Sequence, residues 1–70
     1  MTLLDAMNGK EYIITGINTE DDALNSFLFS LGCYSGAPIT VVSRRKQNCT
    51  VSIKDGRYNI DSRLAGSIMI

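Results

Sequence analysis

The sequence predicts a small, mainly β fold that contains one substantial α-helix. Apolar residues between positions 19 and 31 recur at steps of three and four, whereas those between 38 and 60 mostly alternate. The spacing changes within Leu31-Gly32-Cys33-Tyr34-Ser35-Gly36-Ala37-Pro38-Ile39. Glycine allows positive φ at little cost, and proline prevents a helix from continuing. We therefore expect the helix to end at Gly32 and strands to follow Pro38.

The size and composition indicate one domain spanning residues 1–70. A chain of 70 residues buries only about 60% of its unfolded surface, so its core must be well patterned. A hydrophobic content of 44% argues against disorder. No apolar run approaches the roughly 20 residues that span a bilayer, and the N-terminal residues lack a secretion signal. We expect a cytoplasmic protein that does not insert into the membrane.

The first elements follow from turn and β-forming residues. Residues 2–7 form a short apolar segment in which Leu3 or Leu4 anchors the core, and Asn8-Gly9 predicts a turn. Residues 10–17 are rich in β-formers and predict one strand. A bulge at Gly16 would place Ile14 and Ile17 on the same side.

The helix is predicted from its cap and its apolar stripe. Thr19 is the expected N-cap, followed by acidic residues that suit the positive end of a helix. The buried stripe consists of Ala23, Leu24, Phe27, Leu28 and Leu31. Phe29 lies off this stripe, so it belongs either to a half-covered part of the core or to a binding patch.

Short alternating strands fill the second half. Residues 38–44 predict a strand with Ile39 and Val41 inward, residues 45–48 a hairpin loop, and residues 49–54 a strand with alternate residues inward. Asp55-Gly56 predicts a hairpin turn before a strand over 57–60. Asp61 can cap a short helical turn, and residues 67–70 form a last strand. About five such strands favour an SH3-like barrel, which hides strand edges by closing on itself.

The residue types favour a protein that is not an enzyme and holds no cofactor. There is no histidine, which removes the commonest general base and metal ligand, and neither a Walker A nor a GxGxxG motif occurs. Cys33 and Cys49 are expected to be separate free thiols, too few for a structural zinc site.

The charges are unevenly placed although the formal net charge is zero. Residues 1–35 carry one basic and five acidic residues, whereas residues 36–70 carry six basic and two acidic ones. This asymmetry is either solvated surface or a means to orient a partner. Basic residues with one aromatic suggest a nucleic-acid surface: Arg44, Arg45, Lys46, Lys54, Arg57 and Tyr58. Zero net charge argues against that reading, so we expect no nucleic acid as partner.

The order of packing and turn residues resembles the FeoA family of ferrous iron transport proteins. The matching features are Leu4, Gly9, Ile14 and Ile17, then Leu28-x-x-Leu31-Gly32, Gly36, Ile39-x-Val41, and Arg57-Tyr58-x-Ile60-Asp61-x-x-Leu64-Ala65-x-x-Ile68. The resemblance implies an SH3-like fold, shared with the C-terminal domain of metal-dependent repressors. It also implies a non-enzymatic cytosolic accessory of the membrane transporter FeoB, whose GTPase domain it would bind and modulate.

The predicted contact surface for that partner lies around the end of the helix. Aromatic side chains supply large contact area at low entropy cost, so Phe29 and Tyr34 are the expected anchors. The full set of partner-binding candidates is Phe29, Leu31, Cys33 and Tyr34, with Arg44 and Arg45 as a polar rim. The alternative is a metal-responsive regulatory module, which the two thiols and scattered carboxylates suggest, although no metal ligands are assigned.

Overall fold

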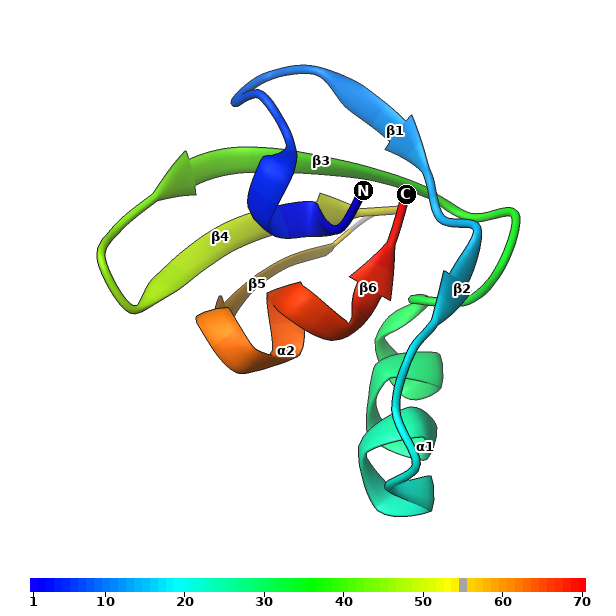
Figure 1. The fold of residues 1–70 in the computed structure, drawn as a ribbon. Helices are drawn as coiled ribbons and strands as arrows, with labels where there is room; N and C mark the ends of the chain where they lie inside the picture. The colour runs from blue at the N-terminus through cyan, green and yellow to red at the C-terminus, as the bar shows by residue number, and fades with distance from the viewer. Residues whose placement is uncertain (55) are drawn as a thin grey trace.

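The main sheet contains four antiparallel strands in the structure, a computed structural model that describes residues 1–54 and 56–70 (Figure 1). In spatial order these strands are β1 (Glu11–Ile13), β3 (Pro38–Arg44), β4 (Asn48–Ile53) and β5 (Gly56–Asp61). A second sheet pairs β2 (Gly16–Ile17) with β6 (Ile68–Met69). The described strands therefore form the mainly β architecture that the alternating pattern predicted.

Three helical segments accompany the sheets. They are the 3-10 helix η1 (Leu3–Asp5), the helix α1 (Asp22–Leu31) and the short helix α2 (Ser62–Ser67). α2 packs against β4, β5 and η1, whereas most of α1 extends away from the sheets (Figure 1). The two chain ends lie side by side, since the Ile70 N–H donates to the Met1 carbonyl over 3.0 Å.

The core lies between the concave side of the main sheet and the segments that cross it. Alternation along β3 and β4 buries Ile39 and Val41, then Cys49, Val51 and Ile53, as predicted. The fully buried side chains that meet them come from η1, α1, the β1–β2 connection and the C-terminal segment: Leu3, Leu28, Ile14, Ala65 and Ile68. Leu3 is thus the N-terminal core residue, and Leu4 is largely exposed.

The prediction of one bulged strand over residues 10–17 is wrong, because the chain leaves the first sheet after Ile13. The Ile14 N–H donates to the Ala37 carbonyl over 2.9 Å, and the Gly36 N–H donates to the Ile14 carbonyl over 2.7 Å. Thr15 then donates to Met69 at the start of the second sheet. Backbone groups of distant segments therefore replace the continuous ladder, and Gly16 lies in β2 rather than in a bulge.

The helix begins two residues later than predicted and buries less of its stripe. Asp21 is the N-cap, and the Thr19 hydroxyl instead accepts from the Asp21 N–H over 3.1 Å. Leu28 alone is fully buried in α1, whereas Phe27 is 49% exposed. Periodicity defines a stripe but not how much of it meets the core, and α1 reaches the sheets mainly through its last turns (Figure 1).

The predicted turns and caps are mostly present. Gly32 ends α1 with φ 98°, and Gly36 has φ 93°. The Asp61 carboxylate accepts from the Leu64 N–H over 2.8 Å and caps α2. The hairpin loop after β3 is shorter than predicted, because Asn48 already pairs in β4. Of the predicted turn Asp55-Gly56, Asp55 lies outside the described residues.

Candidate functional site

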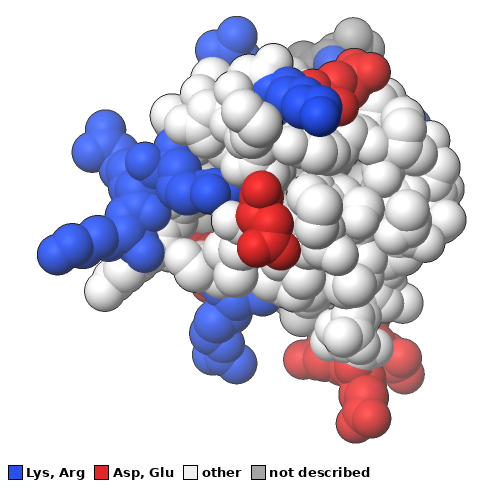
Figure 2. Space-filling view, turned by 45° about the horizontal axis from the view of Figure 1, so that its top comes forward, with Lys and Arg blue, Asp and Glu red and all other residues white. Residues whose placement is uncertain are grey.

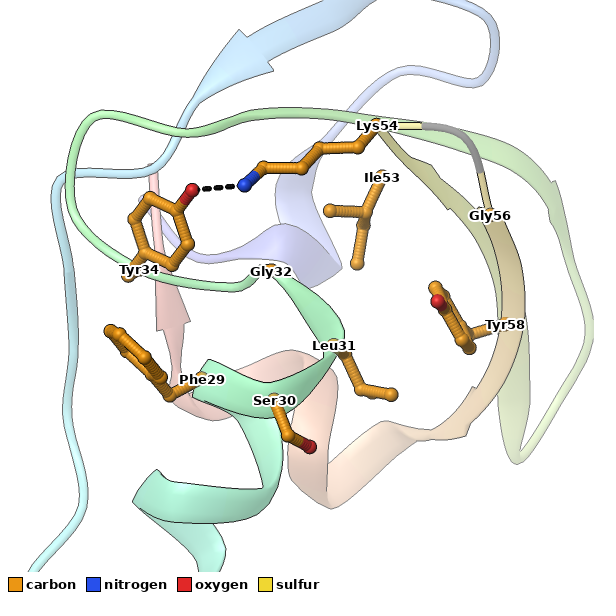
Figure 3. Close-up of a pocket in the computed structure, with 9 residues that line it drawn as sticks. All are labelled: Phe29, Ser30, Leu31, Gly32, Tyr34, Ile53, Lys54, Gly56 and Tyr58. Carbon is orange, nitrogen blue, oxygen red and sulfur yellow. Dashed lines mark hydrogen bonds between the residues drawn. The ribbon is translucent and has the colours of Figure 1, made fainter.

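A pocket of about 640 Å³ opens between the end of α1 and the adjoining ends of β4 and β5 (Figure 3). Its walls come from three segments that are separate in the sequence. The lining residues are Phe29, Ser30, Leu31, Gly32, Tyr34, Ile53, Lys54, Gly56 and Tyr58. We call this the α1–β4 pocket; its volume falls in the range of sites that hold part of a ligand or partner.

Two aromatic rings form one side of the pocket. The ring centroids of Phe29 and Tyr34 lie 5.3 Å apart at an interplanar angle of 41°, within the range of favourable aromatic pairs. Phe29 is nevertheless 65% exposed, so the pair leaves a large aromatic surface in contact with water. Such a surface can bury considerable apolar area against a partner at little cost in side-chain entropy.

Lys54 places a positive charge beside these rings. Its ammonium group donates a hydrogen bond to the Tyr34 hydroxyl and lies 4.7 Å from the Tyr34 ring centroid (Figure 3). Both contacts orient the cation toward the aromatic side of the pocket. The pocket therefore combines apolar surface with one positioned cation.

Glycine at position 56 gives Tyr58 its place in the pocket. A β-carbon built on Gly56 would lie 2.6 Å from the Tyr58 hydroxyl oxygen and 2.8 Å from two ring carbons. The ring therefore needs the open backbone of Gly56 to lie where it does. Tyr58 forms the side of the pocket opposite Phe29 and Tyr34 (Figure 3).

The structure brings three of the predicted partner-binding residues to this pocket and places Cys33 elsewhere. Phe29, Leu31 and Tyr34 all line it. Cys33 is 1% exposed in the core, so its inclusion in a contact surface is wrong. Burial raises the pKa of the Cys33 thiol to about 11, which keeps it protonated at neutral pH. After α1 ends, the Cys33 side chain therefore lies in the core, whereas the next residue, Tyr34, lines the pocket.

Arg44 and Arg45 do not form a rim of this pocket. They lie at the far end of the seven-residue strand β3, and such a strand spans about 20 Å. The Arg44 guanidinium donates to the carbonyl oxygens of Leu3 and Ala6, each over 2.9 Å, and thereby holds η1 beside the hairpin. The prediction that these arginines flank the aromatic residues is therefore corrected.

Lys54 and Tyr58 line the α1–β4 pocket but were not among the residues that the sequence predicted for a contact surface. The sequence analysis grouped Lys54 and Tyr58 with Arg44 and Arg45 in a possible nucleic-acid surface, because all four are basic or aromatic residues of the second half of the chain. The antiparallel register of β3 and β4 pairs Thr40 with Ser52 and Arg44 with Cys49. This register carries Lys54 to the α1 end and leaves Arg44 at the other.

The two thiols do not form a joint site. Cys33 follows Gly32, which packs on Ile53 at the end of β4, whereas Cys49 lies near the start of β4. Burial also raises the pKa of Cys49, an effect that the nearby positive charge of Arg44 opposes. Among residues 1–54 and 56–70, no three His, Cys, Asp or Glu side chains lie close enough together to hold a metal ion.

A family model for the FeoA domain matches residues 1–70. No curated protein sequence matches the chain. Within the described ranges, no helix has the length and apolar character needed to cross a bilayer.

Solved structures share this fold. A crystal structure of an iron uptake regulatory protein, FeoA, has a TM-score of 0.87 and 25% identity, covering 97% of this chain and 91% of that chain. Stenotrophomonas maltophilia FeoA complexed with zinc, described as an SH3 domain protein, has a TM-score of 0.87 and 18% identity, with 99% and 87% covered. A manganese-dependent transcriptional repressor matches with a TM-score of 0.87 and 20% identity over 97% of this chain and 39% of the repressor. The predicted SH3-like fold is confirmed.

Proposed function

Because the chain belongs to the FeoA family, we propose that it is a non-enzymatic accessory protein of ferrous iron uptake that binds the GTPase domain of the membrane transporter FeoB in the cytoplasm. The family is linked to ferrous iron transport, and the related Stenotrophomonas protein is described as a candidate ferrous iron transport activating factor. The two aromatic rings and the one cation of the site suit the binding of a partner.

The observation that supports this proposal is the exposed aromatic pair beside a positioned cation. Phe29 and Tyr34 present apolar surface at the mouth of the α1–β4 pocket, and Lys54 adds one charge. A contact centred on a few aromatic side chains with a polar partner group is typical of the residues that carry most of the energy of an interface. The pocket would receive an apolar side chain of the GTPase domain, with a carboxylate near Lys54.

The test is capture of this protein by the immobilised GTPase domain. Phe29→Ala and Tyr34→Ala should each weaken capture by about 30-fold, since loss of a central aromatic contact costs about 2 kcal/mol or more. Phe27→Ala is the matched control, because Phe27 is also an exposed phenylalanine of α1 but does not line the pocket. Equal capture of all variants, each shown to be folded, would refute the assigned surface.

Modulation is tested separately by GTP hydrolysis. The rate of the GTPase domain is measured with and without this protein, and a changed rate supports a modulating role. An unchanged rate under conditions where the two proteins are bound would remove that role and leave binding alone. The metal-responsive alternative is less favoured: the two thiols that suggested it are free and buried, and burial raises the pKa of Cys33 to about 11, which disfavours the thiolate that binds metals.

A further inference from the structure

A second surface lies at the end of the molecule away from the α1–β4 pocket. It consists of the β3–β4 hairpin with Arg44, Arg45 and Lys46, and of Leu4 in η1 with the following residue Met7; we call it the hairpin–η1 surface. The two bonds from the Arg44 guanidinium to the Leu3 and Ala6 carbonyls join its halves. Leu4 and Met7 directly follow the residues that carry those carbonyls.

Both halves of this surface carry exposed residues, apolar ones in and after η1 and basic ones in the hairpin. Leu4 is 45% exposed and Met7 is 67% exposed, although other apolar residues of the same segment, Leu3 and Ala6, are buried. Arg45 and Lys46 are both exposed in the adjoining loop. Exposed aliphatic side chains next to cations are typical of proteins that lie on a bilayer interface.

The charge is concentrated there although the whole chain is neutral. Figure 2 shows a cluster of basic side chains projecting at the left, the side where the hairpin lies in Figure 1, and a cluster of acidic ones at the lower right, with further acidic groups in the centre and at the top. Carboxylates also lie in the elements that adjoin the hairpin: Asp5 in η1, Glu11 in β1 and Asp61 in β5. The Asp5 carboxylate accepts from the Thr2 N–H over 3.0 Å, and the Asp61 carboxylate accepts from the Leu64 N–H over 2.8 Å. Arg45 and Lys46 lie in the exposed loop between the strands.

We propose that the hairpin–η1 surface binds the surface of an anionic lipid bilayer. Arg45 and Lys46 pair with headgroup phosphates, and Met7 and Leu4 enter the boundary between headgroups and acyl chains. An acidic protein fits less well, because tight protein contacts centre on bulky aromatic anchors, whereas the exposed apolar side chains of this surface, Leu4 and Met7, are aliphatic. A bilayer interface accepts single, flexible side chains without such anchors.

This arrangement orients the molecule. The length of β3 separates the hairpin–η1 surface from the α1–β4 pocket by about 20 Å. A protein bound through the hairpin would therefore hold its pocket away from the bilayer, open to another protein. The inference does not rest on the proposed function, since it concerns different residues.

The test is co-sedimentation of the full chain with lipid vesicles at low ionic strength. The protein should sediment with vesicles of equal parts phosphatidylglycerol and phosphatidylcholine but not with pure phosphatidylcholine, and added salt should weaken binding. The double variant Arg45→Glu, Lys46→Glu should bind at least about 25-fold more weakly, at about fivefold for each cation lost. Lys54→Glu, Arg57→Glu is the matched control: it changes the net charge equally at the opposite end and, compared at about 0.1 M salt where charges are screened within about 10 Å, should lose much less binding.

A second pair of variants tests the apolar part. Met7→Ser should weaken vesicle binding several-fold, whereas Ile13→Ser, which removes an exposed apolar residue of β1, should not. Absence of sedimentation with the anionic vesicles, or equal loss in both charge-reversal variants, would overturn the proposal. Capture of the Arg45→Glu, Lys46→Glu variant by the GTPase domain should be unchanged, so failure here and failure of the proposed function are distinguishable.

Discussion

Gly32 lies directly against Ile53, and a β-carbon built on Gly32 would stand 3.0 Å from the Ile53 Cγ2 atom. Gly32 is also the residue at which α1 ends, with φ 98° and its N–H bonded to the Phe29 carbonyl over 3.0 Å. One residue therefore sets both where the helix stops and how closely its end packs on β4. The position of Phe29 and Leu31 at the pocket depends on this contact.

Gly32→Ala should destabilise the protein by about 1–3 kcal/mol. A left-handed conformation costs a residue with a β-carbon roughly 1–2 kcal/mol, and the contact with Ile53 adds to it. Urea unfolding measures the change in the free energy of unfolding. Gly16→Ala is the control, because a β-carbon there meets nothing within 4 Å and φ is not left-handed. Similar losses in the two variants would contradict the account of Gly32.

Tyr34→Phe separates the role of the ring from that of the hydroxyl. The variant keeps the ring beside Phe29 but removes the oxygen to which Lys54 donates. If the GTPase domain binds at the α1–β4 pocket, affinity should fall by less than in Tyr34→Ala, because the aromatic surface is kept and only the hydrogen bond that positions Lys54 is lost. A titration of the GTPase domain with the unchanged protein, Tyr34→Phe and Tyr34→Ala measures the three affinities. Equal losses in the Phe and Ala variants would assign the contact to the hydroxyl alone.

Asp21→Ala should cost about 1 kcal/mol of stability, the usual value of a helix N-cap. Its carboxylate accepts from the Ala23 and Leu24 N–H groups over 2.9 and 3.2 Å. Asp22→Ala is matched in chemistry and removes an acidic residue of the first turn without removing the cap, so it should cost only a few tenths of a kcal/mol. Thermal unfolding of both variants compares them, and a larger effect at Asp22 would count against this cap.

Cys33 should make stability fall as pH rises above about 9. The pKa of the thiol is about 11 in the folded protein, raised by burial from an ordinary value of 9.0. Between these values the unfolded chain releases a proton that the folded protein retains, so the unfolded state gains stability. The contribution is complete below pH 9 and is lost toward pH 11. Cys33→Ala should show a shallower decline in urea unfolding over this range; an identical decline would show that Cys33 does not contribute.

Local signals in the sequence identified several elements correctly. The left-handed end of α1 at Gly32, the alternation along β4 and the cap at Asp61 each depend on residues within one element. The N-cap of α1 and the strand over residues 10–17 were predicted less well. In the first case a neighbouring carboxylate caps the helix instead, and in the second the backbone groups of distant residues take the hydrogen bonds. Asp21 displaced Thr19 within two residues, and hydrogen bonds to residues 36 and 37 divided the strand.

By itself, the sequence determined the fold class, the end of the helix and the membership of the FeoA family, because periodicity, turn residues and their spacing are properties of the linear chain. Only the tertiary structure decided which side chains share a surface. Lys54 meets Tyr34 across 20 residues, and Arg44 binds Leu3 across 41. Such neighbours result from strand register and from the direction in which each segment leaves the core, and neither is encoded by adjacent residues alone. For that reason Phe29 and Tyr34, close in the sequence, line one pocket as expected, whereas Cys33, Arg44 and Arg45 were assigned to a surface from which folding separates them.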